Sequence, residues 1–532
     1  MATNFTESPE LKGIDPIVEH LEILDREVSE LRDSDVATNS RIDEVENKDL
    51  EQDSELNRHK LRLSDLDDRA NALDVRVNAL DDRDMVYVSS FEASYDNDFD
   101  RIQAALDYCA AHHKSNLCID ARSTPYNIDP RKRTLPHSAD YLRVPSNLHI
   151  WGYGAQLNWT GPAEGVTISN AGDGSTGKYQ QNHDIIIEGL YFTQSDEAMK
   201  HTNILFHHSY DIQIINCRFF YHTQWHFIEI CGCRNTTVSG CDFGGYTRSN
   251  NSSEMLQLDL PKDATNALFA TPYDNTPCEY IKIINNYFHV SAAPTGSNKI
   301  AAIGSHTHVE NKIHTNVVIE GNFFHWLDNA ISTVSLKNSV ISNNECDECG
   351  GFYRTTYADA FFRNIFDGNR INLITAKGGD YRAISLVTDA AESRAEGCVI
   401  SNNVITGGPW HGIAINGSDH TVTGNYVEGA QSAGIYLYYA GGCTVSNNNL
   451  LNCSYATNKT AQAVQVVGAR SSNTITGNHL GYSGDSTGVI NSAGPNNGRN
   501  FIYGNTAQNI TFRAGTDIVH VNYYNGSYQP GE

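Results

Sequence analysis

A short alternation of apolar and polar residues recurs along most of the chain. Each copy places apolar residues on both sides of a central pair, usually Gly-Asn or Asn-Asn, as in Ile283–Phe288 and Val422–Val427. Other clear copies start at Ile319, Ile400, Val445 and Ile475, copies with Cys or Leu in place of the second Asn start at Ile187, Ile214 and Val238, and looser ones start at Ile341, Phe366 and Ile502. The closest starts lie about 22 to 27 residues apart. This period is typical of a solenoid, because one copy is too short to bury its own apolar face and must stack on the next.

The residue types in the motif favour strands over the helices of a leucine-rich repeat. Its apolar positions are mostly Ile, Val and Phe in alternation with polar residues, and Leu is too sparse for the leucine-rich alternative. Gly and Asn tolerate positive φ, so they suit the sharp turn of a coil. We therefore predict an all-β, right-handed parallel β-helix with three strands per coil, in which Asn side chains of successive coils stack into an amide ladder.

A different period precedes the solenoid. Nineteen positions in strict 4-3 spacing run from Ile17 to Leu80, and fourteen of them are apolar. This heptad pattern predicts a coiled-coil helix, roughly 95 Å long at about 1.5 Å per residue. Polar seam residues interrupt it, and such residues usually fix register and the number of chains; they are Asp35, Thr38, Asp49, Gln52 and His59.

The region between the two patterns predicts a cap for the solenoid. Asp98 to His113 reads as an amphipathic helix with Asp98 as its N-cap, and short apolar strands follow. We divide the chain into a coiled coil (1–84), a capping helix with the first coils (85–150), the β-helix with its site (151–490), and a closing segment with trimer contacts (491–532).

Composition excludes several functions. The net charge of −25 disfavours a nucleic-acid partner. The sequence has no apolar run as long as a membrane span, and its polar, acidic start does not resemble a secretory signal. The twelve cysteines are scattered through the body, so we expect small buried core residues. We expect no metal and no other cofactor.

Several local sequences support a family resemblance. After the heptads come Asp96–Leu106 (Asp-Asn-Asp-Phe-Asp-Arg-Ile-Gln-Ala-Ala-Leu), Tyr126–Ile128, Ile150–Ala155 (Ile-Trp-Gly-Tyr-Gly-Ala) and then the Asn-rich coils. This order resembles bacteriophage tailspikes and appendage depolymerases of the pectate-lyase-like superfamily. The resemblance implies a homotrimer in the virion tail, attached to a tail or baseplate protein through its N-terminus, that is assembled in the host cytoplasm and acts on bacterial surface polysaccharide. It leaves the reaction open, because the fold carries hydrolases, lyases, epimerases and inert binders.

A second set of strands can be aligned beside the Asn motif to locate a site. In Phe227–Ile230, Met255–Asp259 and Ala302–His306, the Ile or Leu column points inward, so the intervening residues point outward. The alignment gathers carboxylate, amide and imidazole groups on the outer face of three consecutive coils: His226, Glu229, Glu254, Gln257, Asp259 and His306.

We predict Glu229, Glu254 and Asp259 as the catalytic groups of a glycoside hydrolase. Coil and strand spacing puts Glu229 and Asp259 roughly 8 Å apart, which suits an inverting mechanism. Neighbouring carboxylates would raise at least one pKa, as a general acid requires. His226, Gln257 and His306 would bind substrate.

Other candidates extend or replace this site. Asp274 lies in a long gap between motifs and would line the groove, and Trp326 would stack on sugar rings. Arg354 and Tyr357 would serve a polysaccharide lyase, which is the alternative enzyme. A receptor-binding fibre without turnover and a cellular epimerase remain further alternatives.

Overall fold

The computed structural model describes residues 85–529 except 136–138, 173–174, 196–199, 223–224, 247–252, 264–270, 292–299, 334, 356–360, 375–381, 388–394, 454–462, 470, 482–488, 492–498, 508, 512–516, 521 and 525–526. The predicted coiled coil (1–84) and Tyr357 therefore lie outside the described residues.

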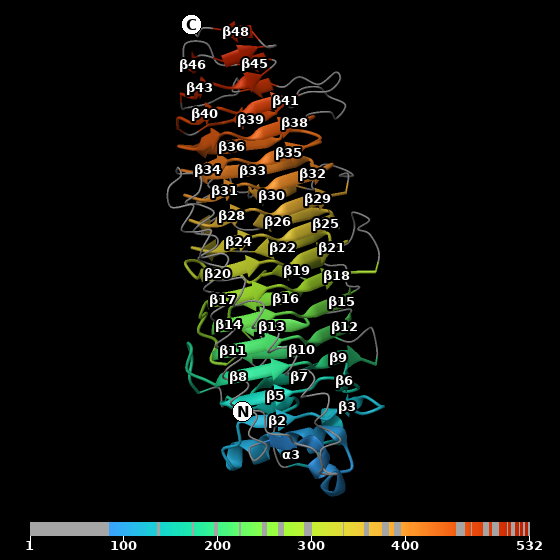
Figure 1. Ribbon diagram of the computed structural model, residues 1–532. Coiled ribbons are helices and arrows are strands. Elements are labelled where there is room, and N and C mark those ends of the chain that lie inside the picture. Colours follow the sequence, from blue (N-terminus) through green and yellow to red (C-terminus); the bar gives the residue numbers. More distant parts are fainter. Residues whose placement is uncertain are drawn as a thin grey trace, which may run out of the picture. The chain divides into compact units, whose positions relative to one another are not determined.

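The described strands form a stack of coils in three long sheets. These sheets contain 18, 14 and 16 strands among the described residues, and successive coils add strands to the three sheets in turn. Neighbouring strands pair in parallel, except for β47 (Asn522–Tyr524) with β48 (Ser527–Gln529) at the C-terminal end. Figure 1 shows the coils rising in chain order from the N-terminal helix to β48. The three-stranded parallel β-helix predicted from the repeat is confirmed.

The 14-stranded sheet carries the aligned columns. Its strands, in order, are β4 (Leu142–Val144), β7 (Glu164–Asn170), β10 (Lys200–His207), β13 (Ile228–Cys231), β16 (Ser253–Asp259), β19 (Ile300–Gly304), β22 (Asn329–Thr333), β26 (Gly351–Thr355), β30 (Arg382–Leu386), β33 (His411–Ser418), β36 (Ile435–Gly441), β39 (Val464–Val467), β42 (Val489–Asn491) and β45 (Asn509–Thr511). Apolar residues at alternate positions fill the interior, and Ile228, Ile230 and Leu256 are fully buried there.

The turns between the other two sheets contain the predicted amide ladder. In each link, the Nδ2 of one Asn donates to the Oδ1 of the Asn in the next coil at 2.8–3.0 Å. The ladder runs through Asn286, Asn322, Asn344, Asn369, Asn403, Asn425, Asn448, Asn478 and Asn505. The residue before each ladder position has a positive φ and is Asn or Gly, for example Asn402 at 54° and Gly424 at 66°. Steric freedom at that residue explains the Asn and Gly of the motif.

The helix α3 (Asp98–Ala111) closes the N-terminal end of the solenoid (Figure 1). It packs beside the 3₁₀ helices η3 (Val88–Ser94) and η4 (Pro130–Lys132), and its apolar face is buried as expected. The predicted N-cap was wrong by one residue, because the Asn97 side chain accepts from the Asp100 N–H at 2.9 Å. Asp98 instead pairs with Arg122 at 2.6 Å.

The cysteines are packing residues. All twelve lie in the described part of the chain as free thiols, and all but the partly exposed Cys118 are buried. Cys217 and Cys241 occupy the ladder position in the coils before Asn286, as the aligned motif predicts. No helix among the described residues is long and apolar enough to cross a membrane.

Candidate functional site

The predicted outward column exists in the 14-stranded sheet. Cross-strand pairing aligns Glu229 with Gln257, Gln257 with Gly304, Gly304 with Ser332, and Ser332 with Arg354. A second column aligns Cys231 with Asp259. The sheet thus brings the predicted carboxylates of β13 and β16 onto adjacent coils.

This face is buried, whereas the alignment suggested a solvated outer surface. Glu229 is 5% exposed, Glu254 3% and Asp259 0%. The segment after β16 crosses the end of β13, where Pro261 and the Thr276 carbonyl pack over Gly232. Cys278 then leads into β17 (Glu279–Ile284) of the 18-stranded sheet, and its Sγ lies 3.6 Å from the Asp259 carbonyl oxygen. The expectation of a solvated face was wrong, and these contacts come from a non-repeating segment, which leaves no periodic signal in the sequence.

Glu254 lies between two imidazoles. Its Oε2 is 3.1 Å from Nδ1 of His306 and 3.8 Å from Nδ1 of His226. The two rings stack with centroids 5.9 Å apart, and Nδ1 of His226 also lies 2.7 Å from the Glu254 carbonyl oxygen. Gly304 is required beside this group, because a Cβ there would lie 2.6 Å from Cγ of Glu254. Four of the predicted residues, including Gln257 at 3.2 Å from His306, therefore form one contact network.

Glu229 and Asp259 form the electrostatically unusual part of the site. Burial and the neighbouring Asp259 carboxylate raise the pKa of Glu229 well above its usual value. Burial likewise raises the pKa of Asp259 to about 7, with His306, the Thr307 side chain and the Leu260 N–H acting in the opposite direction. Oε1 of Glu229 and Oδ2 of Asp259 have no hydrogen-bond partner among the described residues. Asp259 is therefore poised to exchange a proton near neutral pH, and the raised pKa of Glu229 favours its protonated form.

The remaining predicted residues lie elsewhere. Arg354 continues the Glu229 column three coils beyond Gln257, and its Nε donates to Oγ of Ser332 at 3.0 Å. Trp326 lies outside this sheet, after β21 (Phe323–His325), where its Nε1 donates to Glu348. Neither contacts the carboxylates in the described structure.

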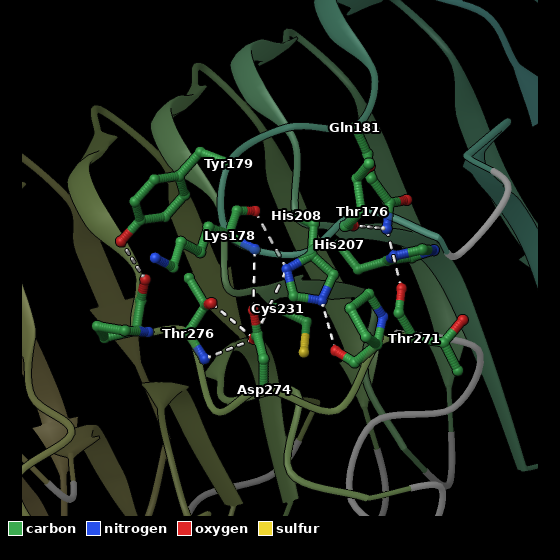
Figure 2. Close-up of polar contacts among 12 residues, drawn as sticks. Thr176, Lys178, Tyr179, Gln181, His207, His208, Cys231, Thr271, Asp274 and Thr276 are labelled. Carbon is green, nitrogen blue, oxygen red and sulfur yellow. Dashed lines mark hydrogen bonds and ion pairs between the residues drawn. The ribbon is translucent and has the colours of Figure 1, made fainter.

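Asp274, which we predict to line a substrate groove, is held by hydrogen bonds in the structure. Its Oδ2 accepts from the Lys178 N–H at 2.9 Å, and its Oδ1 accepts from the hydroxyl and N–H of Thr276 (Figure 2). These bonds lower the pKa of Asp274 despite partial burial, and they fasten the segment before β17 (Glu279–Ile284) to the segment before β8 (His183–Glu188).

Sequence reasoning missed His207. This residue precedes Cys231 in the column that contains Asp259, so extending the alignment one coil earlier would have found it. The two ring nitrogens of His207 have no hydrogen-bond partner among the described residues, and burial lowers its pKa to about 3. A neutral imidazole thus lines the same covered column as the carboxyl groups.

The described residues contain no group of three His, Cys, Asp or Glu side chains arranged to hold a metal ion. What the site offers is acid–base chemistry: two carboxyl groups with raised pKa, a third paired with imidazoles, and a 26%-exposed His306 side chain as its most accessible member.

Comparison with known proteins supports the fold. A family model described as periplasmic copper-binding protein (NosD), a β-helix family, matches residues 386–529, about a quarter of the chain. No curated protein matches. A mutant tailspike of Escherichia coli bacteriophage HK620 in complex with a pentasaccharide is 11% identical, with a TM-score of 0.56 over 82% of this chain and 80% of that one.

Two further solved structures are similar at lower scores. Tailspike protein 3 of bacteriophage CBA120 is 11% identical, with a TM-score of 0.49 over 81% of this chain and 60% of that one. PfbA, a surface adhesin of Streptococcus pneumoniae, is 16% identical, with a TM-score of 0.47 over 84% of this chain and 98% of that one. The chain thus has the right-handed parallel β-helix fold found in phage tailspikes.

Proposed function

We propose that this chain is a phage tailspike that binds a bacterial surface polysaccharide and hydrolyses its glycosidic bonds. The observation that carries the proposal is the pair Glu229 and Asp259. These carboxyl groups lie on adjacent coils, their pKa values are raised, and each has an oxygen with no hydrogen-bond partner among the described residues. Buried polar atoms are normally satisfied, so such a pair is typical of a functional site.

Each group has a role in an inverting hydrolysis. Glu229, which burial keeps protonated, gives its proton to the glycosidic oxygen as the bond to the anomeric carbon breaks. Asp259 takes a proton from the water whose oxygen bonds to that carbon. Glu254 fixes His306 and His226, and Gln257 and His306 contact the sugar. Since Asp259 must be ionised to act as a base, the rate should rise as the pH passes about 7.

The setting follows from the fold and the resemblance. The HK620 tailspike binds a pentasaccharide on the same kind of solenoid. We infer a homotrimer in which residues 1–84 form the coiled coil and connect the spike to a tail or baseplate protein. Arg354, Trp326 and Tyr357 would then serve more distant sugar units or a neighbouring subunit's groove.

The test is turnover of a panel of capsule and O-antigen polysaccharides, following new reducing ends together with the ultraviolet absorbance of unsaturated sugars. We expect reducing ends without absorbance. Glu229→Gln should lower kcat by about 10²- to 10⁴-fold, the usual contribution of a general acid. Glu345→Gln, which alters an exposed carboxylate on β25 (Glu345–Cys349), is the matched control and should retain full activity.

Two other results would replace the proposal. Absorbance from unsaturated sugars would identify a lyase and transfer the roles to His306, Arg354 and Tyr357. Tight binding with neither signal would leave a receptor-binding fibre, an alternative that the burial of Glu229 and Asp259 favours. In that case Glu229→Gln and Asp259→Asn would leave binding unchanged.

A further inference from the structure

A groove lies on the sheet next to the one that carries the carboxyl groups. Its volume is about 560 Å³, and Tyr179, His183, Tyr210 and Arg234 contribute to its lining. β13 ends at Cys231 and β14 (Arg234–Ser239) begins three residues later, so the groove belongs to the 18-stranded sheet. It shares no lining residue with the proposed catalytic site.

The floor of the groove is a ladder of side chains on adjacent strands. Cross-strand pairing places Tyr210 of β11 (Tyr210–Ile215) between His183 of β8 and Arg234 of β14. The rings of His183 and Tyr210 stack with centroids 4.8 Å apart and planes 20° apart. The Arg234 guanidinium carbon lies 6.0 Å from the Tyr210 ring and 5.0 Å from the Tyr179 ring. An arginine is thus held between two aromatic faces at the surface.

Hydrogen bonds hold the wall of the groove in place. The Tyr179 hydroxyl donates to the Pro277 carbonyl oxygen at 2.8 Å, and Asp274 accepts from the Lys178 N–H (Figure 2). The buried His208 ring lies between two carbonyl oxygens, 3.1 Å from that of Lys178 and 2.9 Å from that of Pro272. The wall is therefore formed before any ligand arrives, which reduces the entropic cost of binding.

Arg234 retains its capacity to bind an anion. Its guanidinium makes no ion pair with any described residue. Two nearby carboxylates have other partners: Asp184 lies 2.7 Å from Nδ1 of His183, and Asp211 accepts from Asn235. A third, Glu279, is aligned with Arg234 across β14 and β17 but makes no ion pair with it, and burial together with Glu279 raises the pKa of Tyr179. Arg218 provides the contrast, because it lies 5.4 Å over the Tyr191 ring but is paired with Asp242 at 3.3 Å.

We propose that this groove is a second, non-catalytic saccharide site that binds an acidic sugar unit of the polysaccharide. The guanidinium would pair with the sugar carboxylate, and the Tyr210 and His183 rings would provide a flat face for the pyranose ring. The exposed Gln180 side chain lies at the same groove and can hydrogen-bond sugar hydroxyls. This proposal rests on the proposed polysaccharide binding and adds that the polysaccharide carries acidic sugars. It does not require hydrolysis.

The test measures binding of full-length Glu229→Gln protein, in which turnover is blocked, to arrays of uronate-bearing and neutral bacterial polysaccharides. We expect retention by at least one acidic polymer. Adding Arg234→Gln should weaken that binding about tenfold or more, as expected for a lost charge-assisted bond. Tyr210→Ala should weaken it less, and Tyr210→Phe should restore it because the ring face remains. Arg218→Gln is the matched control and should leave binding unchanged.

The outcomes separate this proposal from the catalytic one. Binding only to neutral polymers, or binding to an acidic polymer that survives Arg234→Gln, would overturn the groove proposal even if the wild-type protein hydrolyses its substrate. Arg234-dependent binding without turnover by the wild-type protein would overturn hydrolysis and support the groove. Unchanged thermal midpoints of the Arg234 and Tyr210 variants will show that lost binding does not reflect unfolding.

Discussion

The amide ladder and the carboxyl column are two buried polar stacks in one solenoid, and they are built in opposite ways. In the ladder, each link pairs an Asn amide with the next Asn, and Asn403 also donates to the Phe366 carbonyl oxygen at 3.0 Å. In the two outward columns of β13 and β16, which together form the carboxyl column named here, oxygens of Glu229, Gln257 and Asp259 have no hydrogen-bond partner among the described residues, although these residues are at most 5% exposed.

This difference distinguishes the side chains that stabilise the coils from the side chains that are candidates for function. A satisfied amide costs little to bury and fixes the register of each turn. An unsatisfied carboxyl group costs free energy, and proteins retain such groups mainly where they serve a function. The ladder continues into the C-terminal coils, whereas the carboxyl groups lie on two neighbouring coils. This contrast places the candidate chemistry on β13 and β16.

The largest expected effect is on the pH dependence of stability. The pKa of Asp259 is about 7 in the folded chain and about 4 when unfolded. A raised folded pKa gives stability that is complete below the unfolded pKa and is lost as the pH rises through the folded pKa. Asp259→Asn should therefore match the wild type near pH 4 and exceed its free energy of unfolding by up to about 4 kcal/mol above pH 7, at roughly 1.4 kcal/mol per pH unit. Urea midpoints across this range measure the gain.

Glu345→Gln is the control for this series, because its carboxylate is 55% exposed and should show no such trend. A constant difference between Asp259→Asn and the wild type from pH 4 to pH 8 would mean that Asp259 is not held protonated. The carboxyl groups would then not differ from the amide ladder in the way that we infer.

Breaking the ladder should have the next largest effect, in the opposite direction. Asn403→Leu removes the acceptor of the Asn369 N–H and Nδ2 and a donor to the Phe366 carbonyl. Each buried group left unpaired costs about 1–3 kcal/mol, so we expect a loss of about 3 kcal/mol or more at every pH. Thermal and urea midpoints measure it, with the exposed Asn127→Leu as the control. A loss below about 1 kcal/mol would show that the ladder is not a stabilising element.

The same contrast explains what the sequence predicted. The ladder repeats with the coil, so Asn322, Asn425 and their equivalents reveal both the turn and the stacking. The outward columns also repeat, and the alignment correctly placed Glu229 beside Gln257. The burial of this face was not predicted, and the contacts of Pro261 and Thr276 with Gly232 and of Cys278 with Asp259 come from a segment without a period.

Contacts that occur in a single coil account for the other features that the sequence did not reveal. The alignment began at Phe227 and therefore left out His207, one coil earlier. Asp274 stays a predicted groove residue, and its contacts with Lys178 and Thr276 could not be predicted because they join two segments that are distant in the sequence. The repeat predicts the turns and the amide ladder, which the coils share. The functional proposals rest on side chains that occur in only a few coils.

The smallest expected effect concerns the turn residue before the ladder. Asn402 has a φ of 54°, and the next coil has Gly424 at the equivalent position with a φ of 66°. Asn402→Ala should cost about 1 kcal/mol or somewhat more, because an alanine Cβ disfavours this left-handed conformation. Asn402→Gly should cost less, although it also loses the bond from Nδ2 of Asn402 to Asp367 at 2.9 Å. Urea midpoints of the two variants measure the difference. If alanine were tolerated as well as glycine, the positive φ would not explain why the motif uses Asn and Gly there; the stacked amide alone would then define the turn.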